Sequence, residues 1–503
     1  MIRLTIVTIF MAIFAGTAHA APQRPNIVVI LADDMGVGDI AYGNKRARVA
    51  TPHLDALAAG GMRFDDAHSS SSVCTPTRYA LLTGRYSWRS ELKDRVTDGF
   101  GRALLAPGQD TIGSLLGRGG YRTAMIGKWH VGMDWPLKGG GYVTEFRSFP
   151  KKRFDEIDYA ADIRGGPIDL GFDTFYGLSA SLDFYPYSWI EGNRVTSVPT
   201  EWMQGRGDKD DRQPFMRAGP ASPGFDPQGV MEEMTARSEA FIARQTGERP
   251  FFLYLSLTAP HTPVLPEAEF AGSSKAGAYG DFIQQLDATV GRVVASLEAA
   301  GQLENTLILF TADNGAARAS FSEEQESEFG HHPSGPYRGR KASLYEGGHR
   351  VPLIAHWPGG IRAGSRSDAL VGLNDLYATF ADLAGSEAGV DGGEDSVSFA
   401  PVLSSPAGRA ARSDLVLRDF AGALAYRQGH WVLLMGRRPR QVELFDLASD
   451  PQQQNDLASL EQDRVAAMRD ALTETILAGR STPGPARQNE GPDRWPMLHW
   501  LED

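Results

Sequence analysis

Several short, uninterrupted apolar runs divide the chain. Within each run the apolar residues do not alternate with polar ones, and each run has the length of a strand rather than of a long helix. Such runs are typical of strands that are covered on both faces, as in parallel sheets. They lie at residues 25–34, 251–263, 306–315 and 351–358, and a further strand is predicted at 121–130.

Helical patterns lie between these runs. Apolar residues recur on one side of segment 277–300, which is the longest such pattern. Shorter helices are predicted at 51–61, at 111–121 and between Pro76 and Gly84. Strands that alternate with helices indicate an α/β fold with helices on both faces of the sheet. In such sheets, ligands bind beyond the carboxyl ends of the strands.

The pattern changes towards the C-terminus. From about residue 410, short strands with turns predict an antiparallel sheet, and a helix follows near 457–478. We therefore expect a large α/β unit over residues 21–409 and a smaller α+β unit over residues 410–503. Residues 131–235 are rich in Gly, Pro, aromatic and charged residues, and we expect them to run over the surface.

The first residues of the chain, 1–20, have the features of a secretory signal peptide. One arginine precedes an apolar run from Leu4 to Ala15, and residues 18–20 read Ala-His-Ala. The run is shorter than the ~20 residues that span a bilayer, and no later segment qualifies. We expect export without stable membrane insertion. The chain has no Asn-x-Ser/Thr sequence, which fits a secreted protein of a bacterial periplasm.

Composition narrows the possible partners. The chain has 503 residues, of which 42% are hydrophobic, and can bury a large core. Its formal net charge is -12 and it has no long basic run, which argues against nucleic-acid binding. A local basic pocket on such a protein still permits an anionic substrate. Cys74 is the single cysteine, so no internal disulfide is expected.

Two of the apolar runs end in hard oxygen ligands. Asp33 and Asp34 close the first run, and Asp313 and Asn314 close the run at 306–315. Side-chain oxygens that converge from two strand ends suit Ca²⁺ or Mg²⁺. They suit zinc less well, because neither pair contains a cysteine or histidine. The sequence therefore predicts a hard-cation site at this edge of the sheet.

A second set of residues could face that site. Arg78 follows Cys74 by about one helical turn, and other cationic or titratable groups lie at strand ends and in loops. One metal ion, these cations and histidines around one nucleophile would neutralise a tetrahedral anion, as phosphoryl or sulfuryl transfer requires. The set comprises Arg78, Lys128, His130, His261 and Lys341.

The segment around Cys74 resembles a known signature. Cys74-Thr75-Pro76-Thr77-Arg78 with Leu82-Thr83-Gly84-Arg85 is similar to the motif of the formylglycine-dependent sulfatases. Further similar motifs follow in family order at 32–39, 126–132, 259–263, 311–315 and 341–348, and LFDLASDPQQQNDLA resembles the family's closing motif. The resemblance implies an alkaline-phosphatase-like fold, in which helices sandwich a mixed sheet, and a bound Ca²⁺.

The resemblance also implies roles for the residues. Cys74 would be oxidised to formylglycine by a formylglycine-generating or radical maturation enzyme, and would also contact the metal held by Asp33, Asp34, Asp313 and Asn314. One hydroxyl of the hydrated aldehyde would attack sulfur, and His261 with Lys341 would protonate the leaving alcohol. His130 would then accept the proton of the second hydroxyl. Arg78 and Lys128 would hold the aldehyde hydrate and the sulfate oxygens.

The substrate is expected to be a sulfated small molecule or glycan. The stretch SLDFYPYSWIEGN resembles arylsulfatases and galactosamine-sulfate sulfatases. This resemblance favours a carbohydrate sulfate ester as the substrate, and an aryl sulfate is the other candidate. Two alternatives are a phosphonate or phosphate ester hydrolase on the same scaffold and a non-catalytic protein that binds sulfated glycans. Candidates for substrate contacts are Asp183, Tyr185, Tyr187, His331, His332 and Arg338.

Overall fold

The computed structural model describes residues 24–501, apart from residues 43, 45, 208–214, 390, 406–411, 439–440 and 493. The signal peptide predicted at residues 1–20 lies outside the described residues. Among those that are described, no helix is both long enough and apolar enough to cross a bilayer.

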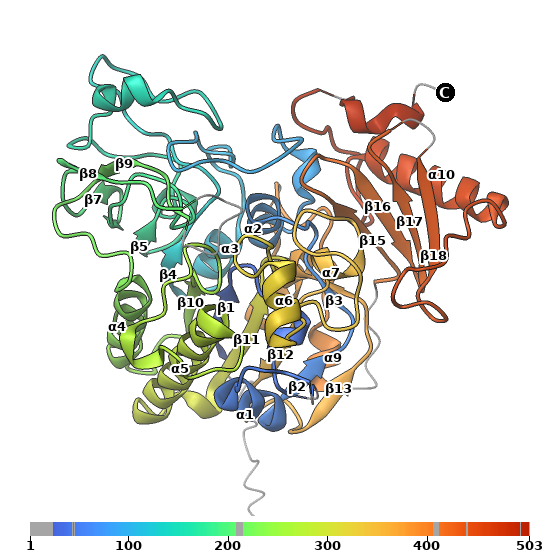
Figure 1. Ribbon diagram of the computed structural model, residues 1–503, viewed down its shortest axis with the longest axis horizontal. Helices are drawn as coiled ribbons and strands as arrows, with labels where there is room; N and C mark the ends of the chain where they lie inside the picture. The colour runs from blue at the N-terminus through green and yellow to red at the C-terminus, as the bar shows by residue number, and fades with distance from the viewer. Residues whose placement is uncertain are drawn as a thin grey trace, which may run out of the picture.

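A ten-stranded mixed sheet forms the centre of the large unit (Figure 1). Its strands lie in the order β13-β2-β12-β11-β1-β10-β4-β5-β6-β7. All the apolar runs expected to be strands belong to it. The bounds are β1 Asn26–Ala32, β2 Met62–Phe64, β4 Arg122–Lys128, β5 Thr174–Leu178, β6 Ile190–Glu191, β7 Arg194–Val195, β10 Phe251–Ser256, β11 Thr306–Ala312, β12 Leu353–His356 and β13 Ser365–Ser367.

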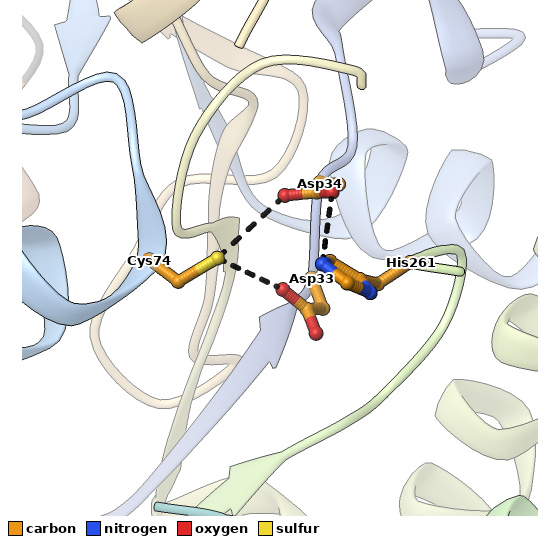
Figure 2. A group of neighbouring side chains, drawn as sticks. All are labelled: Asp33, Asp34, Cys74 and His261. Carbon is orange, nitrogen blue, oxygen red and sulfur yellow. Dashed lines mark hydrogen bonds and ion pairs between the residues drawn. The ribbon is translucent and has the colours of Figure 1, made fainter. Parts of the chain in front are cut away.

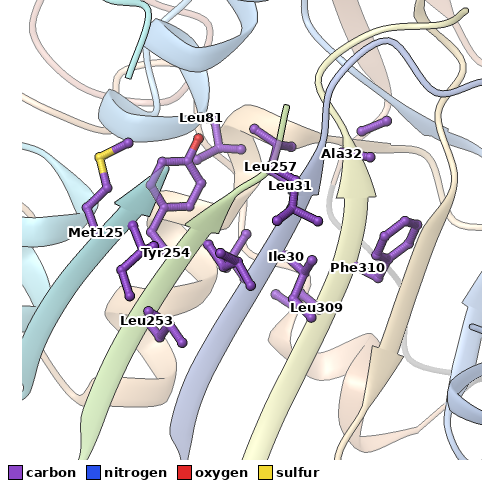
Figure 3. Close-up of a cluster of buried hydrophobic side chains, with 14 of the residues drawn as sticks. Ile30, Leu31, Ala32, Leu81, Met125, Leu253, Tyr254, Leu257, Leu309 and Phe310 are labelled. Carbon is purple, nitrogen blue, oxygen red and sulfur yellow. The ribbon is translucent and has the colours of Figure 1, made fainter. Parts of the chain in front are cut away.

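The register of the central strands brings their carboxyl ends together. Strand β1 pairs in parallel with both β10 and β11, and Ala32 lies opposite Ala312. Asp33 and Asp313, which follow these two residues, therefore leave the sheet at the same edge. Every residue of β1, β10 and β11 is buried, and Figure 3 shows their side chains packed into one apolar core. Burial on both faces explains why these strands are uninterrupted apolar runs.

Helices cover the sheet in two groups. Helix α5 packs against both α1 and α4, and α2, α3 and α8 pack against one another as the second group. The structure confirms the expected mixed α/β sheet flanked by helices. The bounds of the helices are α1 Pro52–Gly60, α2 Cys74–Thr83, α3 Ile112–Arg118, α4 Val230–Ala243, α5 Gly277–Ala299, α6 Glu323–Phe329, α7 Glu346–His349, α8 Leu376–Ala384 and α9 Ala400–Ser404.

The C-terminal part forms a separate small sheet, drawn at the right of Figure 1. Its four antiparallel strands lie in sequence order, and helix α10 packs against two of them. This confirms the expected antiparallel sheet with a helix, although the helix begins later than residue 457. The bounds are β15 Asp414–Arg418, β16 Leu424–Gln428, β17 Trp431–Met435, β18 Val442–Asp446 and α10 Gln462–Ala478.

Two expectations about local structure are wrong. Helix α2 begins at Cys74 rather than after Pro76, because proline is tolerated in a first helical turn, where its missing N–H needs no partner. Segment 131–235 is not a surface excursion. It contributes β5 to the main sheet, and Trp135, Phe149 and Phe154 form a buried aromatic cluster around Phe100.

Short strands complete the described structure. Two small two-stranded sheets pair β14 with β3 and β8 with β9. Strand β3 directly precedes the serine run that leads to Cys74. The bounds are β3 Ala67–His68, β8 Glu201–Met203, β9 Gly219–Ala221 and β14 Val371–Gly372.

Candidate active site

The motif residues converge at the carboxyl edge of the central sheet. Asp33 and Asp34 follow β1, while Asp313 and Asn314 follow β11. Cys74 is the first residue of α2, so its side chain lies at a helix N-terminus that faces these strand ends. Figure 2 shows Asp33 and Asp34, which follow β1, pointing toward Cys74 and His261, which come from two other segments.

Cys74 lies at the centre of this group and is only 1% exposed. Its Sγ is 3.6 Å from Asp33 Oδ1 and 3.8 Å from Asp34 Oδ1. Lys341 Nζ approaches the sulfur to 3.2 Å. In the unmodified chain, Sγ stands where an oxygen of an oxidised residue 74 would lie. Residue 74 is thus positioned between carboxylates and an ammonium group.

Buried ion pairs fix the carboxylates. Lys128 Nζ contacts both oxygens of Asp33, at 2.8 and 2.7 Å. The Arg78 guanidinium donates to Asp313 Oδ2 from Nε at 3.0 Å and from Nη2 at 2.8 Å. All four side chains are completely buried. Burying such charges is tolerable only when each is paired and hydrogen-bonded, as here.

Asp34 connects the two strand ends. Its backbone N–H donates to Asp313 Oδ1 at 3.1 Å, and its carboxylate accepts from Asn314 Nδ2 at 2.7 Å. Lys341 Nζ lies 2.6 and 2.8 Å from the two Asp34 oxygens. Asp34 adopts a φ of 65°, a strained conformation for a residue with a side chain and one that is concentrated at functional sites.

The donor set fits a hard divalent cation. Asn314 Oδ1 is buried and has no hydrogen-bond partner among the described residues, which leaves an amide oxygen free to ligate. The three carboxylates of Asp33, Asp34 and Asp313 supply the remaining oxygens. Oxygen donors of this kind are those that Ca²⁺ and Mg²⁺ prefer.

The same charges shift the pKa values of the site. Burial alone would raise the pKa of Asp33, but Lys128, then His261 and Arg78, hold it below its usual value. The pKa of Asp34 is likewise lowered, chiefly by Lys341, against the effect of burial. Burial, with the Asp313 charge, raises the pKa of the Cys74 thiol. The thiol is therefore protonated at neutral pH and is a poor nucleophile.

Two histidines flank the group. His130 Nε2 lies 3.0 Å from the Thr97 carbonyl oxygen, which places the proton on Nε2 and leaves Nδ1 free to accept, 3.2 Å from Ser181 Oγ. Burial, then the charges of Lys128 and Arg78, keep the pKa of His130 well below 6.5. His261 Nδ1 lies 2.5 Å from the Thr262 carbonyl oxygen, and its Nε2 faces Asp34 Oδ2 at 3.5 Å.

The candidate substrate contacts are only partly near this site. Asp183 adjoins Phe184, whose ring packs against His130 with centroids 5.8 Å apart. Tyr185 and Tyr187 are buried and pack with other aromatic rings. His331 is buried and pairs with Asp39 at 2.8 Å, exposed His332 pairs with Glu326 at 2.6 Å, and Arg338 donates to the Gln453 carbonyl at 2.8 Å. None of these last three contacts involves a residue of the Cys74 group.

Sequence reasoning missed several residues that position the site. Ser256 at the end of β10 accepts from Arg78 Nη1 and donates to the Lys128 carbonyl, so it connects two cationic residues. Arg217 forms an ion pair with Asp183 and stacks 3.9 Å from the Phe184 ring. A serine that closes an apolar strand beside charged strand ends is a usable signal, whereas Arg217 lies in a segment without a regular pattern.

Comparisons with known proteins agree with this geometry. A sequence profile of the family described as Sulfatase matches residues 25–386. The chain is 29% identical to an N-acetylgalactosamine-6-O-sulfatase of Bacteroides thetaiotaomicron, over 90% of this chain and 93% of that protein. It is also 30% identical to a steryl-sulfatase of Mus musculus, over 99% of this chain and 89% of that protein.

Solved structures show the same fold. One, from work on the metabolism of multiple glycosaminoglycans by Bacteroides thetaiotaomicron, superposes with a TM-score of 0.79 at 28% identity and covers 90% of this chain and 99% of its own. A Pseudoalteromonas sulfatase superposes with a TM-score of 0.70 at 25% identity, with 92% of each chain covered. The fold and the site thus define a hydrolase of sulfate esters. The chain belongs to the sulfatase family.

Proposed function

We propose that this sulfatase hydrolyses a sulfate monoester on a galactose- or N-acetylgalactosamine-type sugar, using formylglycine made from Cys74. The observation that carries the proposal is the position of Cys74 Sγ, which lies within 4 Å of Asp33, Asp34 and Lys341. A buried, protonated thiol has little use there as a nucleophile. As an aldehyde hydrate, residue 74 would supply two hydroxyls, one to attack sulfur and one to allow sulfate to leave.

The cations of the site bind the anionic ester. The carboxylates of Asp33, Asp34 and Asp313 balance the charges of Arg78, Lys128 and Lys341. Asp33, Asp34, Asp313 and Asn314 would hold Ca²⁺, or Mg²⁺, with residue 74. When bound, this ion supplies Lewis-acid stabilisation of negative charge. It also makes the net charge of the site positive, which suits an anionic sulfate ester.

The histidines move protons. His130 carries its proton on Nε2 and presents an unprotonated Nδ1, and its lowered pKa keeps the ring neutral, so it can accept a proton. His261 is oriented by the Thr262 carbonyl, which leaves Nε2 directed at the Asp34 side of the site. We assign protonation of the leaving alcohol to His261, assisted by the nearby Lys341 ammonium.

The sugar assignment rests on relatives and on the rim of the site. A relative named N-acetylgalactosamine-6-O-sulfatase is matched over 93% of its length, and N-acetylgalactosamine-6-sulfatases of Mus musculus and Homo sapiens match at 33% and 31% identity. Asp183 precedes Phe184, whose ring packs on His130, and its Oδ1 is buried without a hydrogen-bond partner in the described chain. A sugar hydroxyl is a suitable donor to such a carboxylate oxygen. A steryl ester offers no comparable set of hydroxyls.

Initial rates on matched esters test the proposal. Sulfate release from an aryl sulfate should greatly exceed phosphate release from the matching aryl phosphate, and a Cys74→Ala protein should release neither. N-acetylgalactosamine 6-sulfate should then be cleaved with a higher kcat/KM than a steroid sulfate. Faster cleavage of the phosphate ester would overturn the sulfate-ester assignment, and faster cleavage of the steroid sulfate would overturn only the sugar assignment.

We further propose that the protein is exported and that a separate enzyme, rather than this chain itself, oxidises Cys74. Removal of residues 1–20 would leave a mature chain that begins near Ala21, with a catalytic unit over 21–409 and a smaller unit over 410–503. A formylglycine-generating or radical enzyme would oxidise Cys74. N-terminal sequencing of protein from the periplasmic fraction of the native host tests the export. A chain that retains Met1 in that fraction contradicts the cleavage.

A further inference from the structure

A second group of buried metal-ligating side chains lies apart from the Cys74 group. This histidine–glutamate cluster comprises His68 of β3 with Glu346 and His349 of α7. One ligand atom from each residue lies within 4.8 Å of the other two. All three residues are completely buried, and none has a role in the hydrolysis described above.

The two imidazole rings face each other through the same nitrogen. His68 Nδ1 and His349 Nδ1 are 3.0 Å apart. His349 Nε2 lies 2.9 Å from the Leu344 carbonyl oxygen, and His68 Nε2 lies 2.9 Å from Asp66 Oδ1. Both partners are acceptors, which places the ring protons on Nε2. With both ring protons on Nε2, the two Nδ1 lone pairs face each other, and a cation bound between them would remove their repulsion.

Glu346 supplies a third donor. Its Oε2 accepts from Arg350 Nε at 2.7 Å, whereas its buried Oε1 has no hydrogen-bond partner in the described part of the chain. An unpartnered carboxylate oxygen at a completely buried position is costly unless a ligand satisfies it.

We propose that a zinc ion binds between His68 Nδ1, His349 Nδ1 and Glu346 Oε1. Zinc–nitrogen bonds of about 2.0–2.1 Å span the 3.0 Å between the nitrogens at an angle of about 95°. A slight separation of the rings gives tetrahedral geometry. Zinc-binding histidines donate their other ring N–H to a carboxylate or a backbone carbonyl, and both rings do so here. Two nitrogen donors favour zinc over Ca²⁺.

Two arginines also face the cluster. Asp66 and Glu346 balance the charges of Arg350 and Arg427. Arg427 Nη1 lies 3.1 Å from His68 Nε2. The competing arrangement is therefore a neutral His68 that accepts from Arg427 and donates its Nδ1 proton to His349. That arrangement would set the lone pair of His68 Nε2 against Asp66 Oδ1 at 2.9 Å, and it would leave Glu346 Oε1 without a partner among the described residues.

The zinc ion would stabilise the positions of the segments that carry Cys74 and Lys341. Strand β3 leads through residues 69–73 to Cys74, and α7 follows the loop that carries Lys341. Ser69 N already donates to the His349 carbonyl at 2.8 Å. Arg427, which contacts Asp66, comes from β16 of the C-terminal sheet. The ion would thus tie the segments that carry Cys74 and Lys341 at one point.

Metal analysis of the full-length protein tests the site. Purified wild-type protein should hold close to one zinc per chain, in addition to any Ca²⁺ or Mg²⁺. His349→Gln should lose this zinc, whereas His356→Gln, which alters a half-buried histidine outside the cluster, should retain it. Because His349→Gln could fail to fold, a second measurement uses wild-type protein stripped with a chelator. Zn²⁺ should raise its Tm, and Co²⁺ should give the visible absorption of a nitrogen-ligated tetrahedral site.

Two results would contradict the zinc site. Wild-type protein that contains no zinc, shows no rise of Tm with Zn²⁺ and gives no Co²⁺ absorption would establish the metal-free arrangement. Zinc that is retained in full by folded His349→Gln would also overturn the proposal, since the ion would then be bound elsewhere.

Discussion

Lys341 Nζ lies 3.2 Å from Cys74 Sγ, although 267 positions separate the two residues in the chain. Backbone contact holds their segments together, because Ala342 N donates to the Ser72 carbonyl at 2.8 Å. The same ammonium contacts both oxygens of Asp34. A fixed positive charge therefore lies next to the atom of residue 74 that would react.

Replacing Lys341 should impair turnover far more than folding. We expect Lys341→Ala to lower kcat on an aryl sulfate by about 10²–10³-fold, the usual cost of removing one preorganised electrostatic group. Lys275→Ala, at an exposed position, should leave kcat unchanged. Steady-state kinetics and Tm values of both variants check this. A Lys341→Ala enzyme with wild-type kcat would remove the residue from the reaction.

The unmodified Cys74 thiol should be chemically inert in the folded protein. Burial raises its pKa and leaves it 1% exposed, so neither thiolate nor access is available. Protein made without the maturation enzyme should therefore resist iodoacetamide at pH 8 and react fully after unfolding in urea. Because Cys74 is the only cysteine, one mass shift reports the result. Rapid alkylation of the native protein would contradict the buried, protonated thiol.

Removing the hard cation should abolish activity reversibly. A chelator should stop turnover, and Ca²⁺ should restore it. Asn314→Ala removes the unpartnered Oδ1 and should raise the Ca²⁺ concentration needed for half-maximal activity by at least about tenfold, since ligand number sets affinity. Asn455→Ala, at an exposed position, is the matched control. An Asn314→Ala enzyme with the wild-type Ca²⁺ dependence would exclude Asn314 as a ligand.

His130 should set an unusually acidic limit to activity. A proton acceptor must be neutral, and burial with Lys128 and Arg78 places the His130 pKa well below 6.5. His130 therefore stays unprotonated at pH 6.5, and kcat should fall only when the pH is well below 6.5. His130→Gln should lower kcat by about 10²–10⁴-fold and remove this limb. His430→Gln, at the surface, should keep it. A limb at or above pH 6.5 that disappears in His130→Gln would show that the pKa is not lowered.

The sequence predicted that Asp33 and Asp313 meet at one edge of the sheet, because the signals for it are local. Asp33 and Asp313 each follow a strand that is buried on both faces, so an apolar run and its polar end reveal both position and direction. The antiparallel C-terminal strands were also predicted from a local signal, which is short strands separated by turns.

Long-range packing explains what sequence reasoning missed. The aromatic residues of segment 131–235 look exposed in a glycine- and proline-rich context, yet Trp135 and Phe149 pack on the distant Phe100. His331 looks available for substrate, but it is buried against Asp39, 292 positions away. The pairing of His68 with His349 is also invisible in sequence, since no local spacing connects them.

The proposed mechanism requires that Cys74 become formylglycine and that this residue perform the hydrolysis. The most direct measurement is the mass of the peptide spanning Cys74, taken from an active preparation made in the native host. Conversion to the aldehyde removes sulfur and two hydrogens and adds one oxygen. We expect this mass, with sulfate-ester turnover that rises in proportion to the converted fraction. A preparation that hydrolyses sulfate esters while its Cys74 peptide carries only the unmodified thiol would contradict it.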